Sequence, residues 1–273
     1  MTKKDPLVSV VMPAYNAEKF IGDAIESILN QTFKDFEFII VDDCSKDKTW
    51  KIIQDYAKKD ERIVPVKNEE NLKTTATLNK GINLSKGKYL VRMDADDWSY
   101  PYRIQEQVNF MEKYPDIVVS GGSIEVCDEK LNFKNKREYP NSDEDVRRKI
   151  FRYSPFAHPS IIMKRGSVIE VGMYDEKLPL SQDYDLYFRL GNIGKFANLD
   201  RILIKLRNHP QSSSMSKEKD QERIAVRTRF KADKYYGYKM TLGDRLYSII
   251  QWLSTYVVPG KMKFWLFNLL RSS

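Results

Sequence analysis

Short apolar segments alternate with helix-like segments through the first ninety residues of the chain. The first apolar run, residues 7–13, is almost continuous and ends at a proline, which is typical of a strand buried on both faces of a parallel sheet. Residues 20–29 then show the spacing of a helix with one buried stripe. Further strands are expected at residues 36–41 and 63–66, and further helices at residues 49–60 and 74–84. The alternation predicts an α/β fold that is Rossmann-like, with a mostly parallel, doubly wound sheet and helices on both faces.

A fourth apolar run, residues 89–93, leads directly into three carboxylates at Asp94, Asp96 and Asp97. Because an open α/β sheet places its ligands at the carboxyl ends of its strands, this negative charge predicts a cationic partner. Hard divalent ions such as Mg²⁺ and Mn²⁺ bind carboxylate oxygens together with substrate phosphates. Taken alone, the pattern also fits a solvated acidic turn in which an aspartate caps the chain before Pro101.

The composition is that of a globular protein, with 41% hydrophobic and 12% aromatic residues. A chain of 273 residues is long enough for one large α/β domain with an appendage, or for two small domains. Its two cysteines, Cys44 and Cys127, provide no disulfide framework and no thiolate metal site, which fits a reducing cytoplasm. The short apolar run after the charged first residues is interpreted as a strand, so no signal peptide is expected.

The net charge of +8 is concentrated at the end of the chain. From Met215 onward there are 12 Lys and Arg against 5 Asp and Glu, so residues 1–214 are close to neutral. A basic tail on a near-neutral domain does not indicate nucleic acid as the partner. The sequence also lacks the Gly-x-Gly-x-x-Gly and Gly-x-x-x-x-Gly-Lys-Ser/Thr motifs, which weakens dinucleotide-binding and P-loop interpretations.

Four segments carry a resemblance to a known family: residues 8–16 (VSVVMPAYN), 27–32 (SILNQT), 39–45 (IIVDDCS) and 94–97 (DADD). In order and spacing they resemble the successive motifs of glycosyltransferase family 2. The resemblance covers residues 7–209 and implies a GT-A fold and transfer of sugar from a nucleotide diphosphate sugar with inversion at the anomeric carbon. It divides the chain into a catalytic domain, residues 1–214, and a basic, amphipathic helical tail, residues 215–273. Within the domain, residues 1–122 form the nucleotide-sugar half and residues 123–214 the acceptor half.

The resemblance also implies the residues of the donor site. Those that match nucleotide-sugar contacts of the family are Pro13, Ala14, Tyr15, Asn16, Asp42, Asp43, Asn71, Lys73, Asn79, Asp94, Ala95 and Asp96. Of Asp42 and Asp43, one accepts an N–H of the base, which is uracil in the family, and the other caps the turn. Lys73 stands where the family usually has glycine, and it either contacts phosphate or projects into solvent.

On the acceptor side, Asp183 matches the aspartate of the family's Glu-Asp motif, the general base that removes the proton of the acceptor hydroxyl. Gln182 replaces the usual glutamate, and Asp185 is the competing carboxylate at the start of the same predicted helix. His158 matches a segment beside the acceptor pocket, with a structural histidine as the alternative. Trp98 either packs as a surface aromatic or forms a wall of the sugar pocket.

His209 matches a segment that closes over the diphosphate in the family. With Asp96 and phosphate oxygens, this imidazole would form a site for a divalent metal, Mn²⁺ or Mg²⁺. The sequence has no Gln-x-x-Arg-Trp motif, which argues against a processive polymerase and for transfer of one sugar per encounter.

The remaining segments are less regular. Residues 130–142 are polar and are expected to form a loop, followed by a short helix over residues 142–151 that Ser142 caps. The tail is predicted to begin with a basic helix over residues 217–238. Its basic residues on one face are Arg223, Arg227, Lys231 and Lys234.

Two apolar segments follow that helix, residues 246–258 and 262–270, and each is too short to span a bilayer. A basic helix beside aromatic, amphipathic segments favours attachment to an anionic membrane surface. The alternatives are a helical appendage packed on the catalytic domain and a homodimer interface.

The leading hypothesis is a metal-dependent inverting glycosyltransferase at the inner, cytoplasmic face of the membrane. It would add one sugar, with a UDP-sugar as the expected donor, to a glycan or lipid-linked glycan precursor in the synthesis of cell-surface polysaccharide. Two alternatives are kept: a non-catalytic nucleotide-sugar-binding subunit, and a sugar nucleotidyltransferase, which would need a basic, glycine-rich triphosphate loop that the sequence lacks.

Overall fold

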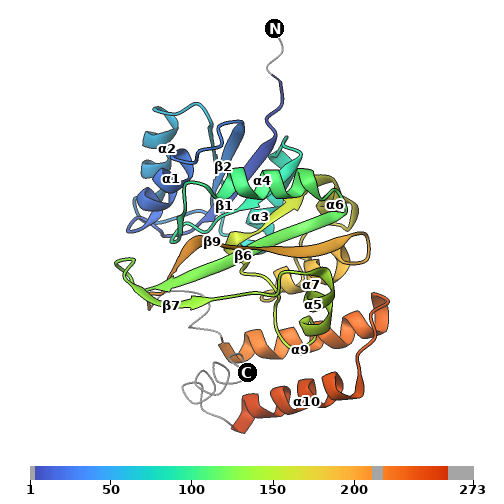
Figure 1. Cartoon of the computed structure of the whole chain (residues 1–273). Coiled ribbons are helices and arrows are strands. Elements are labelled where there is room, and N and C mark those ends of the chain that lie inside the picture. The colour runs from blue at the N-terminus through green and yellow to red at the C-terminus, as the bar shows by residue number, and fades with distance from the viewer. Residues whose placement is uncertain (1–3, 211–217, 258–273) are drawn as a thin grey trace.

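A computed structural model describes residues 4–210 and 218–257 (Figure 1). Among these residues, one nine-stranded sheet has the strand order β3-β2-β1-β4-β8-β6-β9-β5, and β7 pairs with β6 off this path. The strands are β1 (Val8–Ala14), β2 (Phe36–Asp42), β3 (Ile63–Lys67), β4 (Tyr89–Arg92), β5 (Trp98–Ser99), β6 (Ile117–Cys127), β7 (Phe133–Arg137), β8 (Ile162–Lys164) and β9 (Lys195–Arg207). The helices are α1 (Ile21–Leu29), α2 (Thr49–Ala57), α3 (Lys73–Leu84), α4 (Arg103–Lys113), α5 (Asp143–Lys149), α6 (Arg165–Glu170), α7 (Gln182–Leu190), α9 (Glu218–Tyr235) and α10 (Leu242–Val257), with a 3-10 turn, η1, at His158–Ser160.

Strands β1 to β4 run parallel to one another, as predicted, and their register brings their carboxyl ends to one edge. Ala14 at the end of β1 pairs with Asp42 at the end of β2. β4 lies on the other side of β1, and beyond it the Met93 N–H donates to the Val11 carbonyl at 3.1 Å. The turn after β1, the end of β2 and the acidic residues from Asp94 onward therefore meet at the same edge of the sheet.

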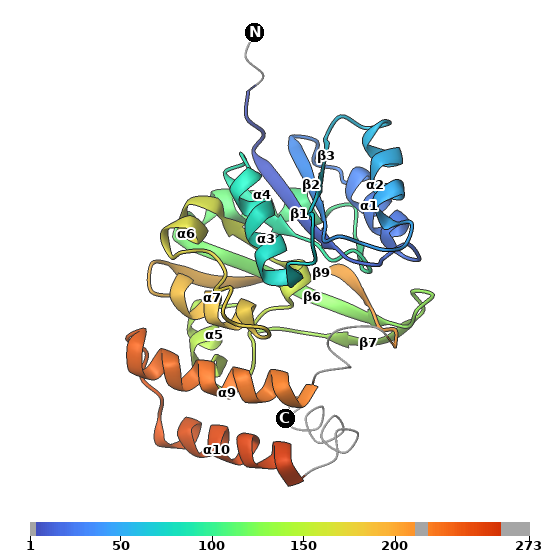
Figure 2. The ribbon, with the colours of Figure 1, turned by 180° about the vertical axis from the view of Figure 1, so that it is seen from behind.

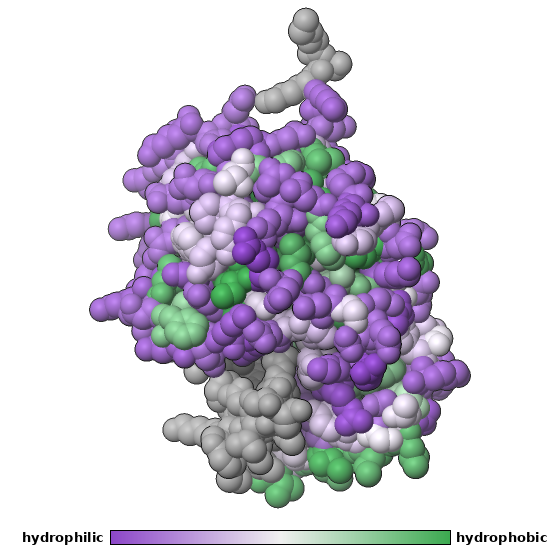
Figure 3. Space-filling view, in the orientation of Figure 1, coloured by the Kyte–Doolittle hydropathy of each residue, from purple (hydrophilic) through white to green (hydrophobic). Residues whose placement is uncertain are grey.

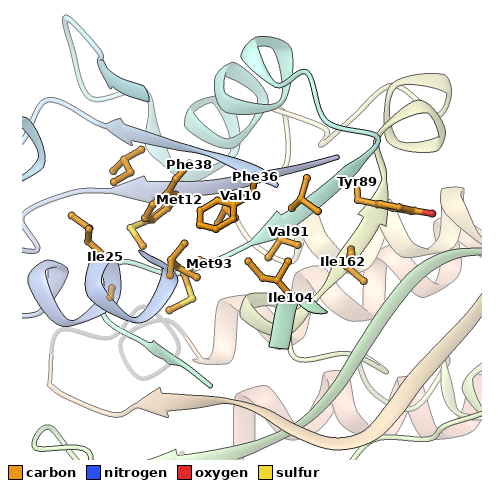
Figure 4. Close-up of a cluster of buried hydrophobic side chains, with 14 of the residues drawn as sticks. Val10, Met12, Ile25, Phe36, Phe38, Tyr89, Val91, Met93, Ile104 and Ile162 are labelled. Carbon is orange, nitrogen blue, oxygen red and sulfur yellow. The ribbon is translucent and has the colours of Figure 1, made fainter. Parts of the chain in front are cut away.

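Alternate side chains of the central strands face two separate cores. On one face, Val10, Met12 and Met93 pack with α1 and α4, as Figure 4 shows. On the other face, Val11 and Leu90 pack with α3, α6 and α7, the helices seen in Figure 2. Each buried side chain of this size contributes about 1.5–3 kcal/mol relative to exposure, so both faces hold the strand ends in place. The helices on both faces confirm the doubly wound prediction.

The acceptor half contains more strands than the sequence indicated. The prediction of a loop over residues 130–142 was wrong, because β7 occupies part of it and pairs antiparallel with β6. Four of the five side chains of β7 are exposed, so its polar sequence carries no alternation of apolar residues, and its backbone pairing defines the strand. The capped helix is confirmed: α5 follows Ser142, whose Oγ accepts the N–H of Asp145 at 3.1 Å.

α9 lies along the acceptor half, and α10 folds back beside α9 (Figure 1). The predicted basic helix is confirmed as α9, and two of its four basic side chains, Arg223 and Lys231, contact other elements of the protein, whereas Arg227 and Lys234 are exposed. Lys231 binds Asp185 of α7 at 2.9 Å, and the guanidinium of Arg223 lies 4.3 Å from the ring centre of Tyr256 in α10. This part of the tail is therefore an appendage packed on the acceptor half, which was the alternative to membrane attachment.

The second core extends into the tail, because the buried Ala232 and Met240 belong to the same cluster as the side chains of α7. The first predicted apolar segment lies within α10 as far as Val257, whereas residues 262–270 lie outside the described part of the chain. No helix among the described residues is both long and apolar enough to cross a membrane.

Candidate active site

Three carboxylates meet directly after β4. One oxygen from each of Asp94, Asp96 and Asp97 lies within 4.8 Å of the others. His209, two residues beyond β9, adds an imidazole whose Nε2 is 2.9 Å from Oδ2 of Asp96. Two ligands at right angles, each about 2.1 Å from one divalent ion, are about 3 Å apart, so this pair fits a shared cation. A carboxylate with an imidazole is a donor set that suits Mn²⁺.

The carboxylates of this loop repel one another. Loss of solvent raises the pKa of Asp97 well above its usual value, and the charges of Asp96 and Asp94 raise it further. Loss of solvent also raises the pKa of Asp94, against the opposing effect of the Arg92 guanidinium. A divalent cation would relieve this repulsion and favour the charged carboxylates. The electrostatics of the loop thus fit a metal ion held by Asp96 and His209.

Arg207 fixes this acidic loop from within the protein. Its backbone N–H donates to Oδ1 of Asp97 at 2.8 Å, and its Nε donates to the backbone carbonyl of Asp96 at 2.8 Å. Its two remaining nitrogens donate to the Glu129 carbonyl and to Asp23 of α1. The arginine of the segment expected to close over the diphosphate is therefore a buried support for the Asp96 loop.

Asp183 occupies the first turn of α7. The residue before α7, Ser181, has a positive φ of 55° and turns the chain sharply into the helix. Loss of solvent raises the pKa of the Asp183 carboxyl, while the backbone N–H of Tyr184 and the charge of Arg92 partly oppose that effect. A carboxylate with a raised pKa, at the start of a helix and beside the acidic loop, is suited to accept a proton.

Asp185, the competing carboxylate, is bound by other side chains of the protein. Its side chain is fully buried and accepts hydrogen bonds from Arg189 at 2.8 Å, Lys231 at 2.9 Å and the Tyr236 hydroxyl at 2.9 Å. These bonds join α7 to α9. The charge of Asp183, by contrast, acts on Asp94 of the acidic loop.

His158 lies among aromatic side chains, beside Tyr174 and Tyr187. Its Nε2 shares a 2.7 Å hydrogen bond with the Tyr174 hydroxyl, and its ring lies at a steep angle to the Tyr187 ring. Loss of solvent, with the nearby Arg92 charge, holds the pKa of His158 well below its usual value. The imidazole is therefore neutral near pH 7 and can form hydrogen bonds to a ligand hydroxyl.

Arg92 was missed by the sequence analysis. It ends β4 with a buried side chain that pairs with Asp94 and influences the pKa values of Asp183 and His158. The available signal was a charged residue within an otherwise apolar strand, since such a residue is almost never fully buried unless it is paired.

Asp42 and Asp43 differ in what their carboxylates can still bind. Both oxygens of Asp43 are engaged, because they accept the N–H groups of Leu72 and Lys73 and the amide of Asn68 at 2.8–2.9 Å. Oδ2 of Asp42 accepts the Ser45 N–H at 3.2 Å, whereas its buried Oδ1 has no hydrogen-bond partner among the described residues. Asp43 shapes the loop before α3, and Asp42 retains an acceptor oxygen without a partner among the described residues.

Three residues predicted to contact the nucleotide sugar lie in α3 or just before it: Asn71, Lys73 and Asn79. Lys73 has a positive φ of 69°, a conformation that favours glycine, which explains why glycine is usual there. Its side chain is exposed. Asn79 is buried, and its amide bonds the backbone of Tyr174 and the Glu176 side chain, so it joins α3 to the segment between α6 and α7. Asn71 has a buried Oδ1 to which no described residue donates.

The first turn presents Tyr15 at the sheet edge, where 49% of its surface is exposed. Asn16 holds this turn to the one after β2, since its N–H donates to Ser45 and its Oδ1 accepts the Lys46 N–H. Pro13 and Ala14 end β1, with Ala14 buried. Ala95 is buried in the first core and spaces the carboxylates of the acidic loop.

Trp98 lies on the α1 side of the acidic loop. Its ring packs edge-on against Tyr100 beneath Lys205. It lines a pocket of about 280 Å³ together with Asp23 and Glu26 of α1. Trp98 is thus packed against Tyr100 and also faces a pocket, which fits both interpretations, a surface aromatic and a wall of the sugar pocket.

Comparison with known proteins identifies the family. The sequence profile described as glycosyl transferase family 2 matches residues 9–172. An uncharacterized glycosyltransferase of Methanocaldococcus jannaschii is 37% identical over 238 residues, which cover 85% of this chain and 82% of the relative. An uncharacterized glycosyltransferase of Haemophilus influenzae is 30% identical over 267 residues, covering 94% of this chain and 83% of the relative.

Solved structures share the fold at lower sequence identity. S. aureus TarS in complex with UDP-GlcNAc has a TM-score of 0.64 and 18% identity, over 91% of this chain and 72% of that chain. The mannosyltransferase PcManGT from Pyrobaculum calidifontis, in complex with GDP-Man and Mn²⁺, has a TM-score of 0.62 and 14% identity, over 99% of this chain and 81% of that chain. The predicted GT-A fold is thereby confirmed, and the chain belongs to glycosyl transferase family 2.

Proposed function

We propose that this glycosyltransferase moves one sugar, with inversion, from a nucleotide diphosphate sugar to a hydroxyl of a glycan or lipid-linked glycan precursor for cell-surface polysaccharide. One observation carries the proposal: Asp94 interacts electrostatically both with Asp96, beside His209, and with Asp183. The charges of a candidate cation site and of a candidate base therefore act on the same carboxylate. This supports inverting transfer, in which the attacking hydroxyl and the leaving diphosphate lie on opposite faces of the anomeric carbon.

The proposed donor site lies at the carboxyl edge of β1, β2 and β4. Asp42 offers its unpaired Oδ1 to an N–H of the base, and Tyr15 offers an exposed ring beside it. Lys73, exposed at the start of α3, is placed as a phosphate contact. A UDP-sugar is the expected donor, which is supported by the UDP-GlcNAc complex of TarS, while the GDP-Man complex of PcManGT makes GDP-sugars the next candidates.

In the proposed reaction, the carboxylate of Asp183 accepts the proton of the acceptor hydroxyl as that oxygen attacks the anomeric carbon. The bond between this carbon and the diphosphate oxygen breaks, and both electrons leave with the diphosphate. A divalent cation held by Asp96 and His209 would neutralise the charge that develops there. The neutral His158, held by Tyr174, positions the acceptor through a hydrogen bond.

The proposal places the enzyme at the cytoplasmic face of a membrane, where a lipid-linked acceptor would be found. α10 exposes a row of apolar side chains, which Figure 3 shows as green surface at the lower end of the molecule. The row consists of Leu246, Ile249, Ile250, Leu253, Tyr256 and Val257. A helix with such a face can lie in the interface of a bilayer.

Co-sedimentation with vesicles containing anionic phospholipid tests this location. Wild type is expected to sediment with the vesicles, and a variant with Leu246, Ile250 and Leu253 replaced by serine is expected to remain in solution. If both proteins stay in solution and light scattering shows a dimer of wild type alone, α10 is a dimer interface.

A screen for nucleotide-sugar hydrolysis without acceptor tests the proposed donor reaction. UDP-, GDP- and dTDP-sugars are compared with Mn²⁺ and with EDTA, using wild type, Asp96→Ala and the control Asp55→Ala on the exposed surface of α2. Metal-dependent release from one donor that Asp96→Ala abolishes and Asp55→Ala retains is the expected result. Absence of both turnover and metal-dependent nucleotide binding would refute the proposal, whereas binding without transfer to any glycan would favour the non-catalytic subunit.

A further inference from the structure

Arg92 has a buried guanidinium that the protein only partly satisfies. Its side chain is 7% exposed and forms an ion pair with the carboxylate of Asp94. Its Nε–H has no hydrogen-bond partner among the described residues. Leaving a buried donor unpaired costs free energy, so such a group calls for a specific explanation.

A second buried donor without a hydrogen-bond partner among the described residues belongs to α7. The hydroxyl of Tyr187 is buried and has no hydrogen-bond partner in the described part of the chain. The charges of Asp183 and Arg92 both act on it, and its ring stands beside His158. Two unsatisfied donors from different elements, β4 and α7, therefore lie around the candidate base.

The position of Arg92 limits what can reach it. The charges of both Asp96 and Asp183 act on Asp94, its partner. In the proposed reaction the diphosphate lies near Asp96 and the acceptor hydroxyl lies at Asp183. The ring of the transferred sugar must then occupy the space between them, against Asp94 and Arg92.

We infer that Arg92 is a donor-sugar contact: it holds Asp94 in place and donates its free N–H to a hydroxyl of the transferred sugar. The inference rests on the proposed function and assigns a residue to the sugar rather than to the nucleotide. Because Asp94 already neutralises the guanidinium, the pair suits an uncharged, hydroxylated ring. A second anion, such as the carboxylate of a uronic acid, is not needed to balance the charge.

The test distinguishes the contribution of the sugar to binding affinity from that of the nucleotide. The probe is the nucleotide sugar that wild type hydrolyses in the screen above, compared with the free nucleoside diphosphate of the same base, for example UDP-GlcNAc against UDP. Calorimetric titration in Mn²⁺ gives both affinities for wild type, Arg92→Gln and Arg92→Lys. Arg62 provides a matched control, because it also pairs with an aspartate two residues away, Asp60, at 2.7 Å and lies outside the site.

Arg92→Gln is expected to lower affinity for the nucleotide sugar roughly tenfold while affinity for the free diphosphate changes less than about threefold. Arg92→Lys keeps the charge beside Asp94 but lacks the guanidinium N–H groups, so it should show the same selective loss even if the glutamine variant does not fold. Arg62→Gln should change neither affinity.

Equal loss of both affinities in folded Arg92 variants, or no loss of either, would overturn the inference and leave the proposed function standing. A wild type that hydrolyses no donor and binds no nucleotide in Mn²⁺ would overturn the proposed function and the inference with it.

Discussion

The nucleotide-sugar half and the acceptor half position their parts of the site in different ways. In the first, Asp42 ends one parallel strand and the loop from Asp94 to Asp97 follows another, so the strand register brings them together, and Arg207 fixes the loop. In the second, the position of Asp183 depends on the packing of α7. Asp185 connects this helix to α9 by its hydrogen bond with Lys231, which lies 46 residues further along the chain. We therefore expect substitutions at the strand ends to change ligand binding with little loss of stability, and substitutions beneath α7 to change stability as well.

Among substitutions tested without an acceptor, Asp96→Ala is expected to have the largest effect. Loss of the candidate metal ligand should lower kcat/KM for donor hydrolysis on the order of 10³-fold, because charge on the departing diphosphate is no longer neutralised. The unfolding midpoint should stay close to that of wild type, since Asp96 is partly exposed. Electron paramagnetic resonance titration of Mn²⁺ measures the metal affinity directly, and unchanged affinity would contradict the proposed site.

Asp185→Asn should act on stability instead. It removes the negative charge that Arg189 and Lys231 share in a fully buried position, and breaking such a pair costs about 3 kcal/mol. Urea denaturation measures the free energy of unfolding. Glu144→Gln, which breaks an exposed pair with Arg148, is the control and should cost less than about 1 kcal/mol. Equal stability of both variants would remove the distinction between the two halves.

The pH dependence of transfer should reflect the environment of Asp183. A base must be deprotonated to act, so activity falls as the pH drops through its pKa. Because loss of solvent raises the pKa of Asp183, the acidic limb of the kcat/KM profile should lie above the usual aspartate value of about 3.9. An acidic limb at or below a pH of about 3.9 would contradict this prediction, because Asp183 would then lose its proton as easily as an exposed carboxyl.

Lys73→Gly should have the smallest effect. Glycine suits the positive φ at this position, so the variant should fold as stably as wild type. If the ammonium contacts phosphate, affinity for UDP should fall roughly threefold to tenfold, and the fall should shrink at high salt. Calorimetric titration at two salt concentrations distinguishes this from a side chain that only projects into solvent, for which affinity would not change.

The sequence predicted those parts of the fold and site that depend on local patterns. Apolar runs and helical spacing located β1 to β4 and their helices, and the acidic loop followed from its place after β4. β7 could not be predicted, because its side chains are mostly exposed and its pairing with β6 defines it. The supporting roles of Arg92, Arg207 and Asp43 also depend on partners from distant segments, which no local pattern reveals.

The central claim is that the nucleotide-sugar half binds the donor, with Asp96 as a metal ligand, whereas the acceptor half supplies the base Asp183 and the second metal ligand His209. Asp183→Asn tests it most directly, with UDP-sugar affinity in Mn²⁺ and the transfer rate measured on the same preparation. We predict unchanged donor affinity and a rate roughly 10²- to 10⁴-fold lower, as expected for loss of a general base. A variant that transfers sugar at the wild-type rate, or one that loses donor binding together with activity, would contradict the claim.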